Sequence, residues 1–287
     1  MRSSVLGHRL HCLRSCLAAP VLVAVCLAGG DADAQGKLDA RYTATLAGVP
    51  IGRGAWVIDI AEDQYTAAAS GMTTGLLQVF ANGHGSGASR GFVRGDNLVP
   101  ITYASSINND KRVEELRIVL SGGTVKEVTL DPPNVPNADR IPLTDAHRRG
   151  VLDPMSAALL RVSGSGDPLS SEACRRTVPV FDGRMRFDLA LSFKRFENVQ
   201  ARGYQGPVVV CGVQFVPLAG YVPQRPAIRY LMAQRDMEVW LAPLAGTHVV
   251  VPFRLSLPTP FGTGVLEATQ FVSVATPRPP PAAAAAR

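Results

Sequence analysis

The sequence predicts a mainly β protein, built on one large antiparallel sheet that curls into a half-open barrel of about twelve to fourteen strands. Two observations predict this class. Apolar and polar residues alternate in long runs, as expected for strands with one face on a core and the other in water. Short segments rich in Gly and Asp separate these runs and are typical of hairpin turns. The 287 residues are 46% hydrophobic and 18% charged, a composition that excludes a disordered polymer.

The first 34 residues have the pattern of a secretory signal peptide. Arg2, Arg9 and Arg14 precede an apolar run at 17–27, and the segment ends in Ala32-Asp33-Ala34. A basic head, a short apolar core and an A-x-A site predict export and cleavage after Ala34. We therefore expect a periplasmic mature protein without a transmembrane span. Acylation of Cys26, an uncleaved anchor and a cytosolic start are the alternatives.

The mature chain is predicted to begin directly with strands. Alternation at residues 38–46, a break at 48–52 and renewed alternation at 56–60 indicate a hairpin. The clearest alternation lies at 184–193, and another run follows at 251–257. Turn signals occur at 121–123, 182–183, 245–246 and 261–262. Together these runs favour an antiparallel meander.

Four segments depart from the strand pattern. Residues 75–82 could form one short helix packed on the sheet, and residues 131–142 form a Pro-rich connector where regular pairing is not expected. A central helix is predicted at 151–163, because Asp153 can cap it and Pro154 suits its first turn. The Pro/Ala tail at 277–287 is expected to be disordered. We expect a single domain at 35–276, with two packed halves as the alternative.

Removal of the signal peptide leaves two cysteines, Cys174 and Cys211. An even and minimal number in an exported protein favours one disulfide over two free thiols. The alternative, a catalytic or metal-binding pair, lacks a C-x-x-C motif or a nearby His. The three histidines of the mature chain lie far apart, so we expect no metal and no cofactor. The arginines are scattered without interleaved aromatics, so nucleic-acid binding is not expected either.

Ser89 lies in a G-x-S-x-G motif, at residues 87–91. This motif surrounds the catalytic serine of many hydrolases. A nucleophile elbow requires a strand before the serine and a helix after it. The surrounding residues 84–94 instead continue a strand pattern. Asp236 and His248 follow in the chain order of a triad, so a periplasmic hydrolase using Ser89 remains the alternative to a non-enzymatic protein.

Four charged residues form the candidate polar site: Asp182, Arg184, Glu238 and Arg254. Asp182 lies in an Asp-Gly turn, where stabilising the turn is its ordinary role and acid catalysis the alternative. Glu238 alternates with apolar neighbours. If it faced a barrel interior it would need a partner such as Arg254, and we state that pairing as a hypothesis.

The order of motifs along the mature chain resembles a family of exported proteobacterial proteins of unknown function. The motifs are YTATLAGVPIGRGAWVI near the start, then VLDPMSAALL, CRRTVPVFDGRMRFDL, GYQGPVVVCGVQFVPLAGY, EVWLAP and VPFRLSLPTPFGTGVLEATQF. The chain is more distantly similar to the β-spiral envelope-integrity proteins and to half-barrel lipoprotein carriers. The resemblance implies a periplasmic β protein, in which Cys174 and Cys211 match the family's cysteine pair. It implies no catalytic residues.

The sequence therefore favours a non-enzymatic, envelope-associated binding or scaffolding protein. A curled sheet with an apolar interior could hold a lipid, an acyl chain or another hydrophobic ligand. An envelope protein partner, and anionic envelope surfaces that contact the arginines, are further expectations.

Overall fold

The computed structural model describes residues 35–75, 83–95, 97–109, 112–164 and 166–276. The expectations for residues 1–34, 76–82 and 277–287 lie outside these ranges. Within the described ranges, strands form one 14-stranded antiparallel sheet, which confirms the predicted fold class. The strands are β1 Gln35–Leu46, β2 Val49–Ile60, β3 Gln64–Thr73, β4 Gly83–Arg94, β5 Asn97–Asn109, β6 Arg112–Ser121, β7 Thr124–Asp131, β8 Leu160–Arg161, β9 Thr177–Phe181, β10 Arg186–Ala201, β11 Tyr204–Ala219, β12 Met237–Pro243, β13 Val249–Thr259 and β14 Gly262–Thr276.

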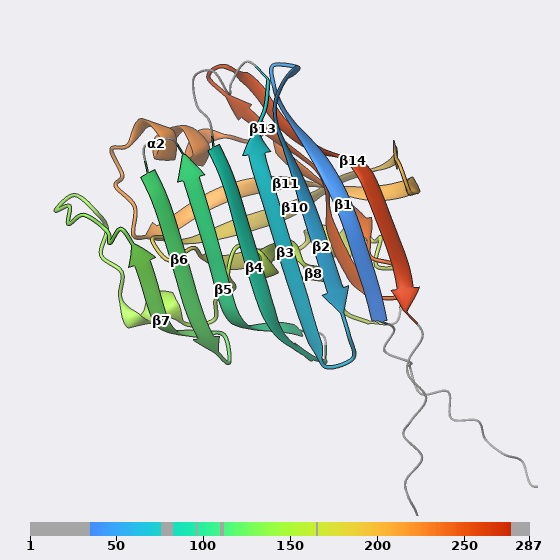
Figure 1. The fold of residues 1–287 in the computed structure, drawn as a ribbon, viewed down its shortest axis with the longest axis horizontal. Helices are drawn as coiled ribbons and strands as arrows, with labels where there is room; N and C mark the ends of the chain where they lie inside the picture. Colours follow the sequence, from blue (N-terminus) through green and yellow to red (C-terminus); the bar gives the residue numbers. More distant parts are fainter. Residues whose placement is uncertain (1–34, 76–82, 96, 110–111, 165, 277–287) are drawn as a thin grey trace, which may run out of the picture. The chain divides into compact units, whose positions relative to one another are not determined.

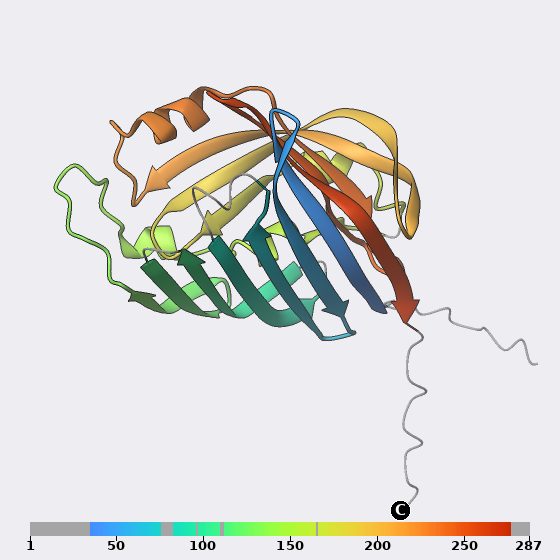
Figure 2. The same cartoon turned by 45° about the horizontal axis from the view of Figure 1, so that its top comes forward.

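The sheet curls so that its two halves face one another. Its strand order is β7-β6-β5-β4-β3-β2-β1-β14-β13-β12-β11-β10-β9, and β8 pairs with β13. The first strand pairs with the last, which joins the two halves through β1 and β14. Strands β1–β7 lie in front of β10 and β11 in Figure 1, and Figure 2 shows the same arrangement from above. The end strands β7 and β9 do not pair in the described chain, so the curl is not closed.

Register shifts help the sheet to bend. Seven shifts interrupt the strand pairs, among them one between Arg90 and Gly91 on β4. An extra residue on one strand increases the local twist. At Gly91 the bend brings the backbone so close to β5 that a Cβ atom would lie 2.3 Å from the Val99 carbonyl oxygen and 2.6 Å from Tyr65 Cε1. Glycine is therefore required by space at this position.

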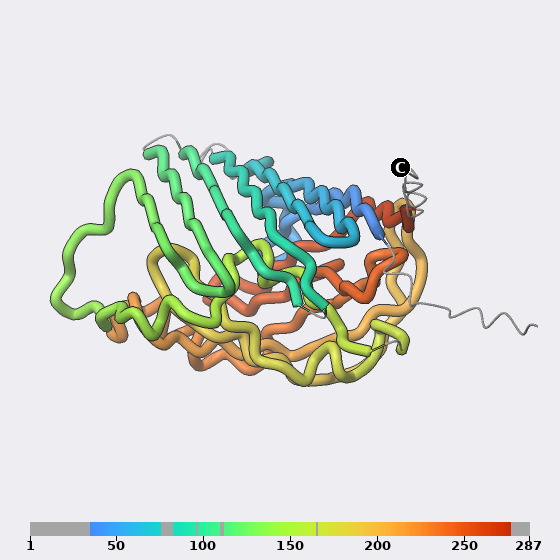
Figure 3. Tube along the Cα trace, turned by 90° about the horizontal axis from the view of Figure 1, so that it is seen from below, coloured from blue at the N-terminus to red at the C-terminus, as the bar shows by residue number. Residues whose placement is uncertain are grey.

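Residues 149–162 form an inner segment that crosses the gap between the two ends of the sheet. The Val151 amide donates to the Gly123 carbonyl at the β6–β7 turn, at 3.0 Å. The Leu152 amide donates to Pro179 at 2.9 Å, and its carbonyl accepts from Phe181, both on β9. Farther along, β8 pairs with β13. Figure 3 shows the N-terminal strands, blue to green, above the yellow and orange C-terminal strands that they face.

The predicted helix at 151–163 is wrong. The segment contains one short 3-10 turn, Ser156–Ala158, and the strand β8. Asp153 does cap backbone amides, but the apolar residues then diverge: Leu159 is buried in one hydrophobic cluster and Leu160 in another. A helix with one apolar face could not bury residues on two opposite sides. An extended backbone directs successive side chains to opposite sides, so both leucines can be buried. The α-helix of the described residues is α2, Pro226–Ala233, with Pro at its first position.

Two further features complete the fold. Residues 133–144, after the Pro-rich stretch begins, contain no strand. No helix within the described ranges has the length and apolar character needed to cross a bilayer.

Candidate binding cavities inside the curled sheet

The inner face of β2 and β3 changes from bulky to small residues along its length. At one end Ile58, Ile60 and Tyr65 are almost completely buried and fill the interior. Toward the other end the same alternation places Gly54 opposite Gly71, and Ala69 opposite Trp56. Small side chains on a curved sheet leave volume that the facing strands do not fill.

That volume is an apolar cavity of about 470 Å³, which we call the glycine cavity. Its wall is formed on one side by β1–β3 and on the other by β13, β14 and the inner segment. The lining residues are Tyr42, Ala44, Gly52, Arg53, Gly54, Ala55, Trp56, Ala69, Ser70, Gly71, Met72, Met155, Ala158, Pro252, Leu255 and Leu266. Leu255, a large hydrophobic residue of this wall, is 38% exposed, so part of its side chain is not covered by protein.

One polar atom of the glycine cavity has no protein partner. Trp56 is 9% exposed, and its indole Nε1 donates no hydrogen bond among the described residues. A buried donor without an acceptor costs free energy. This donor is enclosed by protein atoms, and the cavity offers an occupant a mostly apolar wall with Arg53 and Ser70 as polar residues.

A smaller apolar cavity of about 220 Å³ adjoins the glycine cavity and shares Ala158, Pro252 and Leu255 with it. It extends between the inner segment and β9–β12, where Phe187, Leu189 and Leu191 line it. The two cavities lie along one apolar interior. Sequence reasoning predicted the apolar interior but not its volume, because the volume depends on which residues of distant strands face one another.

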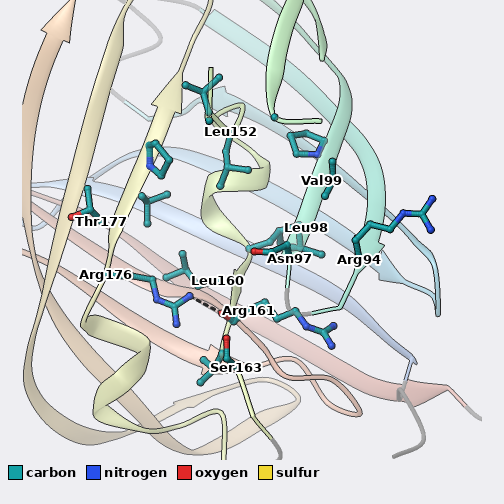
Figure 4. Close-up of a pocket in the computed structure, with 18 of the residues that line it drawn as sticks. Arg94, Asn97, Leu98, Val99, Leu152, Leu160, Arg161, Ser163, Arg176 and Thr177 are labelled. Carbon is teal, nitrogen blue, oxygen red and sulfur yellow. Dashed lines mark hydrogen bonds between the residues drawn. The ribbon is translucent and has the colours of Figure 1, made fainter. Parts of the chain in front are cut away.

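A third and larger cavity, about 840 Å³, lies where the sheet fails to close; we call it the arginine cavity. Its wall comes from the β4–β5 and β6–β7 turns, the inner segment and the start of β9. Four arginines line it together with one acid, Glu172. In Figure 4, the Arg176 side chain reaches the main chain of Arg161, the Arg161 side chain extends away from Arg176, and Arg94 lies on the opposite side.

Arg176 is held by carbonyl oxygens. Its Nη1 donates to the Arg161 carbonyl at 2.6 Å, the dashed line in Figure 4, and its Nη2 to the Glu172 carbonyl at 3.5 Å. The Glu172 carboxylate accepts from Arg175 at 2.8 Å. Burial lowers the pKa of Arg176, and the nearby charge of Glu172 opposes that shift. The adjacent Arg175 and Arg176 stand out in the sequence, but their position next to a cavity depends on the fold and could not be predicted from the sequence.

A buried polar cluster anchors the inner segment to β3 and β4. The Ser89 hydroxyl donates to Asp153 Oδ2 at 3.0 Å and lies 2.9 Å from Ser156 Oγ. The Tyr65 hydroxyl lies 2.6 Å from the same Ser156 oxygen. The other carboxylate oxygen of Asp153 accepts from the amides of Met155 and Ser156, both at 3.0 Å. Burial raises the pKa of Asp153, while these hydrogen bonds oppose the shift.

The cluster does not have the geometry of a catalytic serine. Ser89 lies in the continuous strand β4 and is 4% exposed, with its side chain directed at Asp153 and Ser156. A serine nucleophile requires a base in hydrogen-bond reach and an open approach for the substrate. The Asp153 carboxylate is in hydrogen-bond reach of Ser89, but both groups are enclosed by protein. Ser89 lines none of the three cavities, so the open approach for a substrate is missing.

Asp182 and Arg184 act at the β9–β10 turn. Asp182 Oδ1 accepts from the amides of Arg184 and Met185, at 2.8 and 2.6 Å, as expected for an Asp-Gly turn. Burial raises the pKa of Asp182, opposed by these hydrogen bonds. Arg184 reaches across to Glu114 on β6, at 3.0 Å, and to Asn134. The turn thus links the two ends of the open sheet a second time.

Glu238 and Arg254 lie on β12 and β13 but bind other partners. Glu238 accepts from Arg195 at 3.0 Å through each carboxylate oxygen, and from Lys194 at 2.8 Å. These bonds lower the pKa of Glu238 to about 2. Arg254 stacks on the Trp240 ring at 4.8 Å and faces Glu267 at 3.8 Å. The hypothesised Glu238–Arg254 pair is therefore replaced by a wider ionic group around Trp240.

None of the three cavities is lined by a residue of the predicted polar site, which comprises Asp182, Arg184, Glu238 and Arg254. The sulfur atoms of Cys174 and Cys211 lie at disulfide distance, 2.03 Å. Across the described part of the chain, no group of three or more His, Cys, Asp and Glu side chains is arranged to hold a metal ion.

The fold and cavities define a class: a curled, unclosed antiparallel sheet with an apolar interior. Residues 41–269 match the model of a family described as proteins of unknown function, DUF3108. The chain belongs to this family, as the resemblance in its motifs predicted.

No curated protein matches the chain. Among solved structures, the chain is similar to the crystal structure of a β-barrel-like protein of the DUF1849 domain of unknown function from Brucella abortus. The two are 10% identical with a TM-score of 0.45, over 83% of this chain and 98% of the other.

Proposed function

We propose that this protein is an exported, non-enzymatic binding protein of the cell envelope that holds a hydrophobic ligand in the glycine cavity. Residues 1–34 act as the signal peptide in this proposal, the mature domain occupies 35–276, and Cys174 and Cys211 are oxidised after export. The main support for this proposal is the glycine cavity itself, which has a volume of about 470 Å³ and a mostly apolar wall. This volume is in the range of small-molecule sites, which are concave and mostly apolar.

The residues of the wall indicate which class of ligand would fit the glycine cavity. Gly54, Gly71 and Ala69 offer a smooth apolar face, which suits an acyl chain or a similar flexible hydrocarbon. Arg53 and Ser70 are polar residues of the wall, so a hydrocarbon with one polar group, such as an ester or ketone oxygen, would fit it. The adjoining 220 Å³ cavity extends the apolar path beyond Leu255. No observation favours the alternative hydrolase.

A fluorescent apolar probe, N-phenyl-1-naphthylamine, tests the proposal with one filled-cavity variant. A Cβ at residue 71 would contact only the Arg53 carbonyl oxygen, at the ordinary distance of 3.5 Å, so we expect the G71L variant to fold. Because Gly71 lines the cavity, the leucine side chain should occupy part of its volume. The matched control is G83L on β4, where the nearest atom is also at 3.5 Å and which lines none of the cavities. We expect G71L to weaken probe binding at least about tenfold, because a filled apolar site loses its contact area.

The control G83L should bind the probe as the wild type does. Equal probe binding by wild type, G71L and G83L, with all three folded by thermal melting, would reject the glycine cavity as the ligand site.

A further inference from the structure

Two arginines that line the arginine cavity, Arg94 and Arg176, form no ion pair among the described residues. Four arginines, Arg94, Arg161, Arg175 and Arg176, line it together with one acid. That acid, Glu172, is already bonded to Arg175 through its carboxylate. Cations that share one concave site raise the local positive potential, and a low-dielectric wall strengthens it. The cavity is therefore complementary to an anion.

Arg176 is the best placed of these cations to bind one. It is only partly exposed, and the acceptors of its Nη atoms are two main-chain carbonyl oxygens. Its Nε is buried and donates no hydrogen bond in the described structure. Carbonyl oxygens hold the guanidinium in place but do not neutralise it. Charge-assisted bonds to carboxylate or phosphate are stronger than bonds to neutral acceptors, so an anion would gain from this site.

Much of the remaining wall is apolar, with Asn97, Ser163 and Thr177 as polar residues on it. Eight hydrophobic side chains, prolines apart, line the same cavity: Leu98, Val99, Val151, Leu152, Leu159, Leu160, Val162 and Val178. Leu160 and Val178 also line the 220 Å³ apolar cavity, so these two side chains form a shared wall between the charged and the apolar spaces. Most of these side chains are buried by protein, but Val99 and Leu152 are partly exposed. An amphiphile would cover that exposed hydrocarbon, whereas a free inorganic anion would not.

We propose that the arginine cavity binds a single-chain amphiphile with an anionic head, a carboxylate or a phosphate. The head group bonds to Arg176, with Arg94 on the opposite side of the opening. The hydrocarbon tail lies along Leu152 of the inner segment and Val99 of β5. This site is separate from the glycine cavity, and the inference does not rest on the function proposed for that cavity.

Calorimetric titration of the purified mature G71L variant with three probes, below their micelle concentrations, tests the proposal. In this variant a leucine occupies the glycine cavity, while the lining of the arginine cavity is unchanged, and the variants below are made in the same background. Dodecanoate carries the chain and the negative head, dodecyltrimethylammonium carries the same chain with a positive head, and inorganic phosphate is an anion alone. We expect dodecanoate to bind at least about tenfold more tightly than either of the others, since both the charge and the chain contribute.

Two variants assign the site. R176Q should weaken dodecanoate binding about tenfold or more, because it removes a charge-assisted bond, and R176K should recover part of the loss. R94Q provides a second variant at an exposed position, should R176Q fold poorly. The matched control is R229Q on α2, which removes an exposed arginine that lines none of the cavities and should bind as the G71L parent does.

Three results would overturn the proposal: equal affinity for the cationic detergent, equal affinity for inorganic phosphate, or unchanged dodecanoate binding in folded R176Q and R94Q. The G71L variant separates this site from the glycine cavity. It should lose N-phenyl-1-naphthylamine binding and still bind dodecanoate at the arginine cavity, so failure at one cavity is distinguishable from failure at the other.

Discussion

The buried cluster of Ser89, Asp153, Ser156 and Tyr65 gives a prediction that separates a structural serine from a catalytic one. The change S89A removes one hydroxyl that lies 3.0 Å from Asp153 Oδ2 and 2.9 Å from Ser156 Oγ. Asp153 is fully buried, so water cannot replace the lost donor. Losing a hydrogen bond to a buried carboxylate should lower the free energy of unfolding by about 1.5–3 kcal/mol.

Thermal and urea unfolding of the mature protein measure this effect. For a domain of this size the loss corresponds to a fall in the melting temperature of about 3–12 °C. The matched control is S86A, on the same strand but with its side chain exposed, which should change stability by less than about 0.5 kcal/mol. Probe binding in the glycine cavity should persist in folded S89A. A stability equal to that of S86A, together with a lost hydrolytic activity, would refute the structural role.

The remaining predictions concern the ionic group and the cysteine pair. The pKa of Glu238 is lowered to about 2 by its bonds to Arg195 and Lys194, so this group stabilises the protein above its unfolded value of 4.5 and loses that contribution as the pH falls toward 2. Urea unfolding across this range should show a shallower acid decline for E238Q than for wild type; parallel curves would contradict the pairing. Replacing both Cys174 and Cys211 by serine should cost about 4 kcal/mol on the chain-entropy model for residues 37 apart. Dithiothreitol should destabilise the wild type and leave the double variant unchanged, and an effect on both would count against the bond.

The strands could be predicted because their signal is local. The alternation at residues 38–46 and 251–257 depends only on which face of each strand is buried, and both lie in strands of the sheet. The helix at 151–163 could not be judged in the same way. Leu159 and Leu160 sit at adjacent positions, and only the surrounding sheet decides that both are buried on opposite sides of an extended segment.

The cavities lie beyond sequence reasoning for a related reason. Gly54 and Gly71 are glycines in strands, which by themselves suggest only a bend or a close approach. Their meaning depends on Leu255 and Pro252, nearly two hundred residues away, on the facing wall. Asp153 was recognised as a cap for backbone amides, and it does accept from them, but its bond to Ser89 joins residues 64 apart. Pairings of this kind follow from the curl of the sheet.

The central claim is that the interior of the sheet holds a hydrophobic ligand, and mass spectrometry tests it most directly. Mature wild type, G71L and G83L are purified in parallel without detergent, and their organic extracts are compared at equal protein. We expect a stoichiometric hydrophobic compound with wild type and G83L, and its loss from G71L. The same compound at the same level with folded G71L, or no compound with any of the three, would contradict it.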